Sequence, residues 1–370
     1  MKKPEFFVYG LDFLKDLNLI TIILAPFILD LKLDLNAYVY VVASFRITQL
    51  FCSIPAGIMV DKISPKLSIF ISGLLYLAGL IFLSFQNLSI SNFIFFNVLN
   101  ALSFCFYGAS SNKYLKQISN FENFNKHYSK KMSFRKIGNI SSGLIATILL
   151  LFLSFREIIY VQISISLLFL FITFFLKNTS SVSIKKFILK EIPLKEIFEV
   201  VLSLAPFFII VDLFFVFLIN KVTQDPKVFT ILLTIGNIFV VLAMNYSMKI
   251  KNIFPTNSKK LFMITILPII VYIITQNPFL AIGFVPISIL SRSVSIFKMS
   301  DFLKNIDSKK MGTCEAIINT TNTSIVGLFA IIFGKYLIPN EHLWVFILIG
   351  CLVTIGIFYS VKTLFISSKS

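Results

Sequence analysis

Several long apolar stretches of this sequence contain ionisable side chains, which are the groups best able to do chemistry there. They are Asp12, Lys15, Asp16, Arg46, Asp212 and Arg292. Ionisable groups are costly in apolar surroundings, so such positions generally indicate a functional role. A carboxyl group that meets a basic side chain in one conformation and loses it in another can bind and then release a proton. These residue types therefore indicate ion pairing and proton binding.

Asp16 and Arg46 are the pair that we expect to do this. Arg46 lies near the middle of its apolar stretch, and Asp16 enters the apolar region from the opposite side. An ion pair between them would lower the cost of burying both charges. We predict that Asp16, with Asp12 as the alternate, binds a coupling proton. Arg46 and Arg292 would compete as its partners or hold an anionic group of a substrate. The alternative is a static structural ion pair.

Polar side chains at helical spacing supply further candidates for the lining of a substrate cavity. The acid among them is Asp212, and the amides are Asn97, Asn100, Asn139, Asn237 and Asn319. Each of these residues could instead form a hydrogen bond between two helices.

Catalytic and metal chemistry are disfavoured by the residue types. The chain has four cysteines and two histidines, and none of them shows the spacing of a metal site. Neither histidine lies beside an activated serine or cysteine, and the sequence contains no GxxxxGK phosphate-binding loop. We therefore expect no metal, no cofactor and no enzymatic activity. A polytopic membrane transferase is the alternative from another class, and it would need an accessible histidine, paired acids or a metal set.

The elements that must position these residues are membrane-spanning helices. Of the 370 residues, 57% are hydrophobic and 14% are charged, and the mean hydropathy is +0.88, whereas soluble domains are about a quarter charged. Apolar runs of about 20 residues recur along the chain, and in lipid such a run must be helical. We predict twelve helices, at residues 8–29, 37–60, 67–86, 92–112, 132–153, 157–176, 197–219, 228–248, 261–275, 279–299, 311–333 and 343–363.

The predicted fold is an all-α polytopic membrane protein in which two six-helix bundles surround a central cavity. The N-terminal bundle covers residues 1–176, a basic cytoplasmic linker covers 177–196, and the C-terminal bundle covers 197–370. The linker is polar, rich in lysine and interrupted by Pro193. An eleven-helix count is the alternative, because the ninth predicted helix is short and contains Pro268.

Basic residues predict the orientation, since short loops rich in lysine and arginine stay in the cytoplasm. With the N-terminus inside, most basic residues fall in inner loops, including seven from Lys113 to Lys136. The net charge of +17 then reflects topology and attraction to anionic membrane lipid, so no nucleic-acid partner is expected. We predict a retained first helix and a multi-pass protein of the plasma (inner) membrane with both termini in the cytoplasm.

The ten residues GIMVDKISPK, from Gly57 to Lys66, form the turn between the second and third predicted helices. Gly57 would allow close helix packing, and Asp61 could accept hydrogen bonds from the N-terminus of another helix. The spacing of Gly57, Asp61, Lys62 and Lys66, together with two six-helix halves and a basic central loop, resembles the major facilitator superfamily of secondary transporters. The preceding CSIPAG, residues 52–57, is similar to a segment of efflux-type members.

That resemblance implies a role for the turn. It would hold the cytoplasmic side shut through a contact between Asp61 and the helix that begins near Gly312, while Lys62 and Lys66 would anchor the turn to acids or lipid headgroups. The contact would break in each transport cycle, so Gly57, Asp61, Lys62 and Lys66 would form a gating latch. The alternative is an ordinary inner loop with an incidental aspartate.

The resemblance also implies a function, which is the movement of a small molecule by alternating access. We predict export of an amphiphilic or hydrophobic compound in exchange for protons. The alternatives are proton-coupled uptake of a polar nutrient and a non-transporting member of the fold. The expected partners are the small-molecule substrate, protons and membrane lipid, and the chain is expected to act as a monomer.

Overall fold

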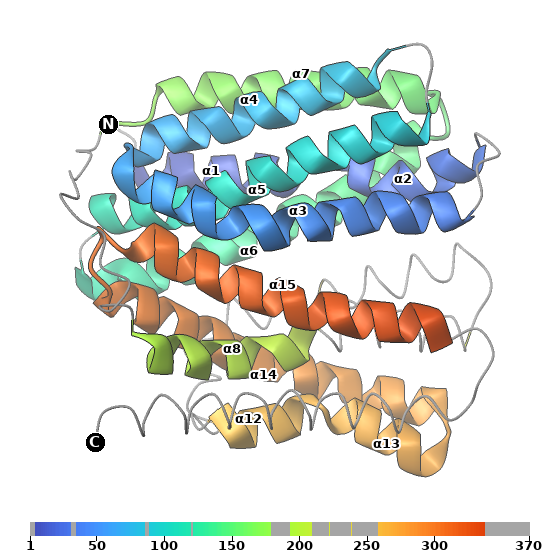
Figure 1. The fold of residues 1–370 in the computed structure, drawn as a ribbon, viewed down its shortest axis with the longest axis vertical. Coiled ribbons are helices and arrows are strands. Elements are labelled where there is room, and N and C mark those ends of the chain that lie inside the picture. The colour runs from blue at the N-terminus through green and yellow to red at the C-terminus, as the bar shows by residue number, and fades with distance from the viewer. Residues whose placement is uncertain are drawn as a thin grey trace.

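A computed structural model describes residues 4–30, 35–85, 89–119, 121–178, 193–208, 222, 238 and 258–336. Within these ranges the chain forms helices and turns, with no strand. The long helices run side by side, so their ends gather at two opposite ends of the bundle (Figure 1). The all-α class predicted from composition is confirmed.

The described helices fall into two sets, called here the first half and the second half of the chain. The first half contains α1 (Pro4–Asp16), α2 (Leu19–Asp30), α3 (Leu35–Lys62), α4 (Pro65–Leu83), α5 (Ile90–Ile118), the short 3-10 helix η1 (Phe121–Asn123), α6 (Phe124–Leu149) and α7 (Phe155–Phe174). The second half contains α8 (Leu194–Phe208), α12 (Ser258–Thr265), α13 (Leu267–Thr275), α14 (Pro278–Asn305) and α15 (Met311–Tyr336).

Most of the predicted helices that fall in the described ranges are present, with shifted ends. The stretch predicted at 261–275 is divided into α12 and α13, because Pro268 stands in the first turn of a new helix. Outside the described residues lie the predicted helices at 228–248 and 343–363, the last part of 197–219 and most of the linker predicted at 177–196.

The stretch predicted at 8–29 is likewise divided, between α1 and α2. The Gln162 side chain of α7 fills the break: its Oε1 accepts a hydrogen bond from the Leu19 amide at 2.9 Å, and its Nε2 donates to the Leu17 carbonyl oxygen at 3.2 Å. A buried side-chain amide thus satisfies backbone groups that the break leaves without helical partners.

Helix α5 ends six residues later than predicted, and α6 begins eight residues earlier than predicted. The basic stretch from Lys113 to Lys136, predicted as an inner loop, lies mainly in the last turns of α5 and the first turns of α6. Lys113 and Lys131 are buried rather than exposed. The loop prediction was wrong for these two residues, because their ammonium groups lie beside acids inside the bundle instead of meeting water.

Four of the described helices are long and apolar enough to cross a membrane: α4, α5, α7 and α14. Large apolar side chains on α4 and α7 point outward, among them Leu74, Ile81 and Phe171. Such side chains are stable against lipid, so this surface suits a membrane-embedded bundle.

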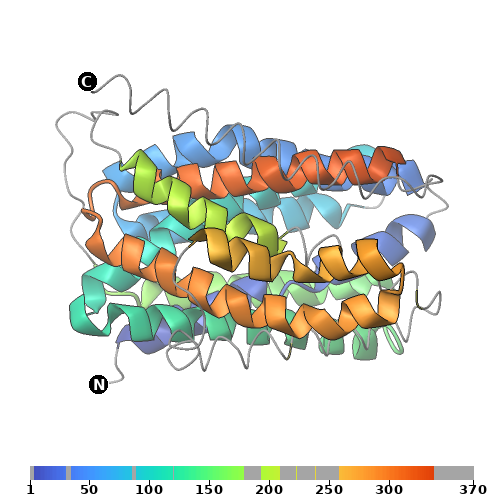
Figure 2. The ribbon, with the colours of Figure 1, turned by 90° about the horizontal axis from the view of Figure 1, so that it is seen from below.

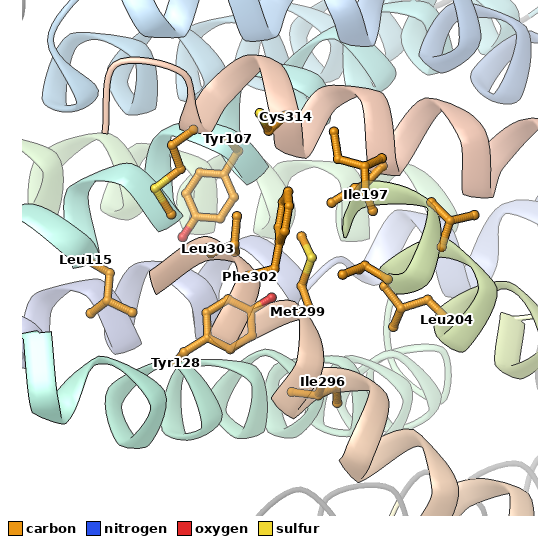
Figure 3. Packing of buried hydrophobic residues seen from close by; sticks show 14 of the residues in the cluster. Tyr107, Leu115, Tyr128, Ile197, Leu204, Ile296, Met299, Phe302, Leu303 and Cys314 are labelled. Carbon is orange, nitrogen blue, oxygen red and sulfur yellow. The ribbon is translucent and has the colours of Figure 1, made fainter. Parts of the chain in front are cut away.

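The two halves pack against each other along α3 and α15, which lie side by side in both views (Figures 1 and 2). Near the end of the bundle where α3 ends and α15 begins, one hydrophobic core joins side chains of both halves. Figure 3 shows Tyr107 of α5 and Tyr128 of α6 close to Leu303 of α14, in a cluster that also includes Leu115 of α5. This apolar contact closes that end of the bundle, which is called the Asp61 end.

Candidate functional site

Asp61 lies in the last turn of α3 and is fully buried. Its Oδ1 accepts a hydrogen bond from the Gly312 amide at 2.8 Å, and its Oδ2 accepts from the Thr313 amide at 2.8 Å and the Thr313 hydroxyl at 2.7 Å. These amides belong to the first turn of α15, where amide groups lack helical partners and the helix dipole favours an anion. The contact is the one expected for this turn, and it joins the two halves of the chain.

Two glycines allow α3 and α15 to come this close. A Cβ atom at Gly57 would lie 2.5 Å from the Cβ of Ala316 and 2.6 Å from the carbonyl oxygen of Gly312. A Cβ atom at Gly312 would lie 2.7 Å from Oδ1 of Asp61 and 2.7 Å from the carbonyl oxygen of Gly57. A side chain at either position would therefore push the two helices apart.

Lys113 of α5 holds the other side of Asp61. Its Nζ donates to the main-chain carbonyl oxygens of Val60 at 2.8 Å and Asp61 at 3.1 Å, and it lies 3.7 Å from Oδ1 of Asp61. Both side chains are completely buried. The lysine caps the last turn of α3, and it compensates the Asp61 charge from within the first half.

The two lysines of the turn itself lie apart from this contact. Lys66 donates to the main-chain carbonyl oxygens of Phe174 at 3.0 Å and Leu176 at 2.7 Å, at the end of α7. Lys62 is exposed. The predicted anchoring to acids or lipid headgroups is wrong for Lys66, because the carbonyl groups at a helix C-terminus lack helical partners and accept its ammonium group instead.

The predicted ion pair between Asp16 and Arg46 does not form in the described part of the chain. Arg135 of α6 donates to both carboxylate oxygens of Asp16, from Nε at 3.2 Å and from Nη2 at 3.1 Å. Arg46 donates to Oε1 of Gln49 on its own helix at 3.3 Å. Arg135 reaches Asp16 because α6 lies against α1, where Gly138 approaches the α1 backbone too closely for a Cβ atom.

Asp12 lies one turn before Asp16 on α1 and is fully buried. Its Oδ2 accepts a hydrogen bond from the Ser111 hydroxyl at 3.1 Å. Its Oδ1 lies 3.9 Å from Nζ of Lys131 and 3.9 Å from Nε of Arg135, without a hydrogen bond among the described residues. The two acids of α1 thus share the basic groups of α6.

Glu315 of α15 connects this group to the second half. Lys131 donates to Oδ1 of Asn112, and Nδ2 of Asn112 donates to Oε1 of Glu315 at 2.6 Å. Glu315 is buried, and its Oε2 has no hydrogen bond within the described ranges. The acid–base cluster is defined as Asp12, Asp16, Lys131, Arg135 and Glu315.

The other predicted cavity residues are spread along the bundle. Asn97 donates to the carbonyl oxygen of Val41 at 2.8 Å and so joins α5 to α3. This is an interhelical hydrogen bond, the alternative to a place in the cavity lining. Asn100 is buried, and Asn139 and Asn319 are half-buried. Outside the described residues lie Asp212, Asn237 and the side chain of Arg292.

Sequence reasoning missed Lys113, Lys131, Arg135 and Glu315. Glu315 lies inside the apolar stretch predicted at 311–333, so the criterion that selected the other buried acids could have found it. The three basic residues lie in polar segments that look like solvated loops. The spacing of Lys131 and Arg135, four residues apart, was the available signal, because it places both on one face of a helix.

The described ranges contain no group of three or more histidine, cysteine, aspartate or glutamate side chains that could hold a metal ion. The site therefore consists of buried carboxylates, ammonium and guanidinium groups, side-chain amides and two helix ends. Groups of these kinds can bind protons, exchange partners and hold an anion.

Comparison with known protein families places this geometry in context. The family model described as Major Facilitator Superfamily matches residues 6–367. The chain belongs to the Major Facilitator Superfamily. Its members are membrane-embedded transporters of small molecules, so membership supports a secondary transporter. A comparison with curated proteins gives no match.

Solved structures of Major Facilitator Superfamily transporters have the same fold as this chain. A bacterial homologue of the iron transporter ferroportin, in an outward-facing state, has a TM-score of 0.75 at 13% identity, with 97% of this chain and 99% of that chain covered. The human organic anion transporter MFSD10 has a TM-score of 0.67 at 10% identity, covering 87% and 90%.

The E. coli fucose:proton symporter is similar to the same degree. It has a TM-score of 0.64 at 16% identity, with 90% of this chain and 92% of that chain covered. At these identities the likeness shows the fold alone.

Proposed function

We propose that this protein is a proton-coupled secondary transporter that exports a small amphiphilic or hydrophobic molecule by alternating access. In this proposal the Asp61 end is the cytoplasmic gate, and the structure represents the conformation in which that gate is closed. The inner position of the Asp61 end rests on the excess of basic residues in the loops predicted on that side. It implies both termini in the cytoplasm and a multi-pass plasma (inner) membrane protein acting as a monomer.

The observation that carries the proposal is the contact between Asp61 and the N-terminus of α15. All three hydrogen bonds to the Asp61 carboxylate come from neutral donors of the second half, whereas its ion-pair partner Lys113 belongs to the first half. If α3 and α15 separate, Asp61 keeps its counter-charge and the α15 amides meet water. A contact of this kind can form and break repeatedly, as a gate requires.

The acid–base cluster supports proton coupling, with Asp16 and Asp12 as the proposed proton sites. It contains three carboxyl groups and two basic groups, so one negative charge exceeds the positive charge when all five are ionised. Lys15 also interacts electrostatically with Asp16, but its Nζ donates its hydrogen bond outside the cluster, to the Ser103 hydroxyl at 2.5 Å, and lies 4.8 Å from the centre of the Tyr76 ring. An unbalanced buried charge is costly, and a proton on one carboxyl group removes it.

The direction of transport and the class of substrate rest on the similarity of CSIPAG, residues 52–57, to a segment of efflux-type members. Uptake of a polar nutrient is the second candidate. It is favoured by the density of buried polar groups in the acid–base cluster, which would suit a ligand that forms hydrogen bonds.

A ligand screen followed by a flux assay tests the proposal. Compounds that bind the native protein raise its melting temperature by mass action, so a mixed library of lipophilic cations, organic anions, sugars and amino acids identifies the ligand class. Selected compounds are then tested in proteoliposomes that contain a pH-sensitive dye. Export by proton exchange predicts stabilisation by several lipophilic compounds and accumulation in inverted vesicles whose interior is acidic.

Variants of the cluster separate coupling from binding. Asp16→Asn and Asp12→Asn should retain ligand binding and lose proton movement, whereas Glu122→Gln removes an exposed acid of η1 and should change neither. Stabilisation by one polar class, with accumulation in right-side-out vesicles whose exterior is acidic, would replace export by uptake. An absence of ligand-dependent proton movement with every compound would contradict a proton-coupled transporter and favour a non-transporting member of the fold.

A further inference from the structure

A second polar contact between the two halves lies beside that of Asp61. Lys116 of α5 donates from Nζ to the main-chain carbonyl oxygens of Leu303 at 2.8 Å, Lys304 at 2.9 Å and Ile306. These oxygens belong to the end of α14, where carbonyl groups have no helical partner. The ammonium group therefore caps the C-terminus of a second-half helix, the end that the helix dipole makes negative.

Asp61 and Lys116 together hold both ends of one turn. Helix α14 ends at Asn305 and α15 begins at Met311. Asp307 braces the residues between them, because its Oδ1 accepts from the Lys309 amide at 3.0 Å and its carbonyl oxygen accepts from the Lys310 amide at 3.0 Å. A first-half acid thus meets the positive end of α15, and a first-half base meets the negative end of α14.

Neighbouring side chains extend the junction between α6 and α14. Nδ2 of Asn125 donates to Oδ1 of Asp301 at 2.6 Å, and the Ser300 hydroxyl donates to Oδ1 of Asn125 at 2.8 Å. Nζ of Lys304 lies 4.2 Å from the centre of the Phe121 ring. The end of α14 is therefore held by several first-half residues, among which Lys116 supplies a partly buried charge.

We propose that Lys116 is a second gating residue, which holds the Asp61 end shut by capping α14 and releases it when this end opens. The inference rests on the proposed function, because it assumes that the two halves separate there. Lys116 and Asp61 carry opposite charges and bind different helices of the same helix–turn–helix unit. Lys116 binds the C-terminus of α14, and Asp61 binds the N-terminus of α15. The gate is then a clamp on the whole α14–α15 turn rather than a single contact.

Lys66 provides a matched control within the same molecule. It caps the C-terminus of α7 with two hydrogen bonds from its ammonium group, as Lys116 caps α14, but both Lys66 and α7 belong to the first half. Removal of either lysine deletes one helix cap. Only the loss of Lys116 should change how the two halves are arranged.

The test is a distance measurement between spin labels in lipid. Labels are placed at two exposed positions, Lys126 in the first half and Lys309 in the second, in a full-length background in which the four cysteines are replaced by serine. Double electron–electron resonance then gives the populations of short and long distances. Lys116→Gln should raise the ratio of long to short distances about tenfold, because it removes charge-assisted hydrogen bonds that exist only when this end is closed.

Two further variants complete the design. Lys66→Gln should lower the melting temperature and leave the distance distribution unchanged, and Lys116→Arg should restore the distribution of the parent protein. If Asp61→Asn produces the long distance and Lys116→Gln does not, the role of Lys116 is refuted while the gate stands. If Asp61→Asn also leaves only the short distance, the separation of the halves at this end is itself refuted, and the proposed function with it.

Discussion

Contacts inside the first half and contacts between the halves both use hydrogen bonds of charged side chains, but the charged groups are placed differently. Inside the first half, Arg135 pairs with Asp16, so both charges belong to the same rigid part. Between the halves, Asp61 and Lys116 each form hydrogen bonds with backbone groups at a helix end, which carry no formal charge. At these two contacts the first half supplies the charged side chain, and the second half supplies mainly backbone amides and carbonyls.

This difference indicates how a junction can be both specific and reversible. Separation of two buried opposite charges leaves each without its partner, which costs several kcal/mol, whereas separation of a charge from a helix end costs about 2 kcal/mol or less. Lys113 belongs to the same half as Asp61 and lies 3.7 Å from its Oδ1, so we expect the two to stay together when α15 moves away. Glu315 and Asp301 are exceptions, because each is a second-half acid that accepts a hydrogen bond from a first-half asparagine, Asn112 or Asn125.

Asp61→Asn is expected to have the largest effect. It removes the anion from the N-terminus of α15 and leaves the buried Lys113 ammonium without its counter-charge, and breaking a buried pair in this way costs about 3–5 kcal/mol. We expect transport to fall at least about hundredfold, while the amount of protein in the membrane stays within twofold of the parent. Transport rates normalised to membrane protein measure this, and near-normal transport would show that Asp61 is incidental.

Gly57→Ala and Gly138→Ala form the next comparison. Both introduce a methyl group where backbone atoms lie too close, between the halves at Gly57 and inside the first half at Gly138, and overpacking of this kind costs about 1–3 kcal/mol. Gly57→Ala should increase the long spin-label distance with a small change in melting temperature, and Gly138→Ala should do the reverse. Equal losses of melting temperature without any change in distance would remove the distinction between the two regions.

Glu315→Gln is expected to have a smaller effect, because its side-chain oxygen can still accept the hydrogen bond from Asn112. We expect the ratio of long to short distances to change by less than about tenfold, the equivalent of one hydrogen bond. Asp12→Asn, by contrast, should leave this ratio unchanged and stop proton movement. A larger change of this ratio with Asp12→Asn than with Glu315→Gln would mean that Asp12, and not Glu315, holds the two halves together within the cluster.

Lys62→Gln should have the smallest effect of the series. The Lys62 side chain is exposed, and surface substitutions usually change stability by less than about 0.5 kcal/mol. Melting temperature and distance distribution should both match those of the parent protein. A clear increase in the long spin-label distance would show that Lys62 does belong to the gating latch predicted from the sequence.

The contact of Asp61 with α15 could be predicted because the Gly57–Lys66 turn resembles that of the Major Facilitator Superfamily, and the resemblance implied a partner helix beginning near Gly312. The partner of Asp16 could not. Arg135 lies in the polar segment FNKHYSKKMSFRK, which has the composition of a solvated loop. It becomes a half-buried residue only because α6 starts at Phe124 and packs against α1. Arg46 was the more obvious partner, since its own surroundings are apolar, but it faces Gln49.

Lys116 shows the same limit in another form. A lysine near the end of a predicted helix favours an inner loop, and nothing in its neighbours along the chain points to the end of α14. Its partners are main-chain carbonyl groups, which every residue possesses, so residue types carry no signal for such a contact. Only the arrangement of the two halves reveals it.

The most direct test of a gate at the Asp61 end is to lock it shut. Asn125 and Asp301, which are hydrogen-bonded across the halves at 2.6 Å, are replaced by cysteines in the cysteine-free background and joined by a short reducible cross-linker. The account predicts that transport of a ligand found in the screen stops on cross-linking and returns on reduction, with either single-cysteine variant unaffected. Undiminished transport by the fully cross-linked protein would contradict it.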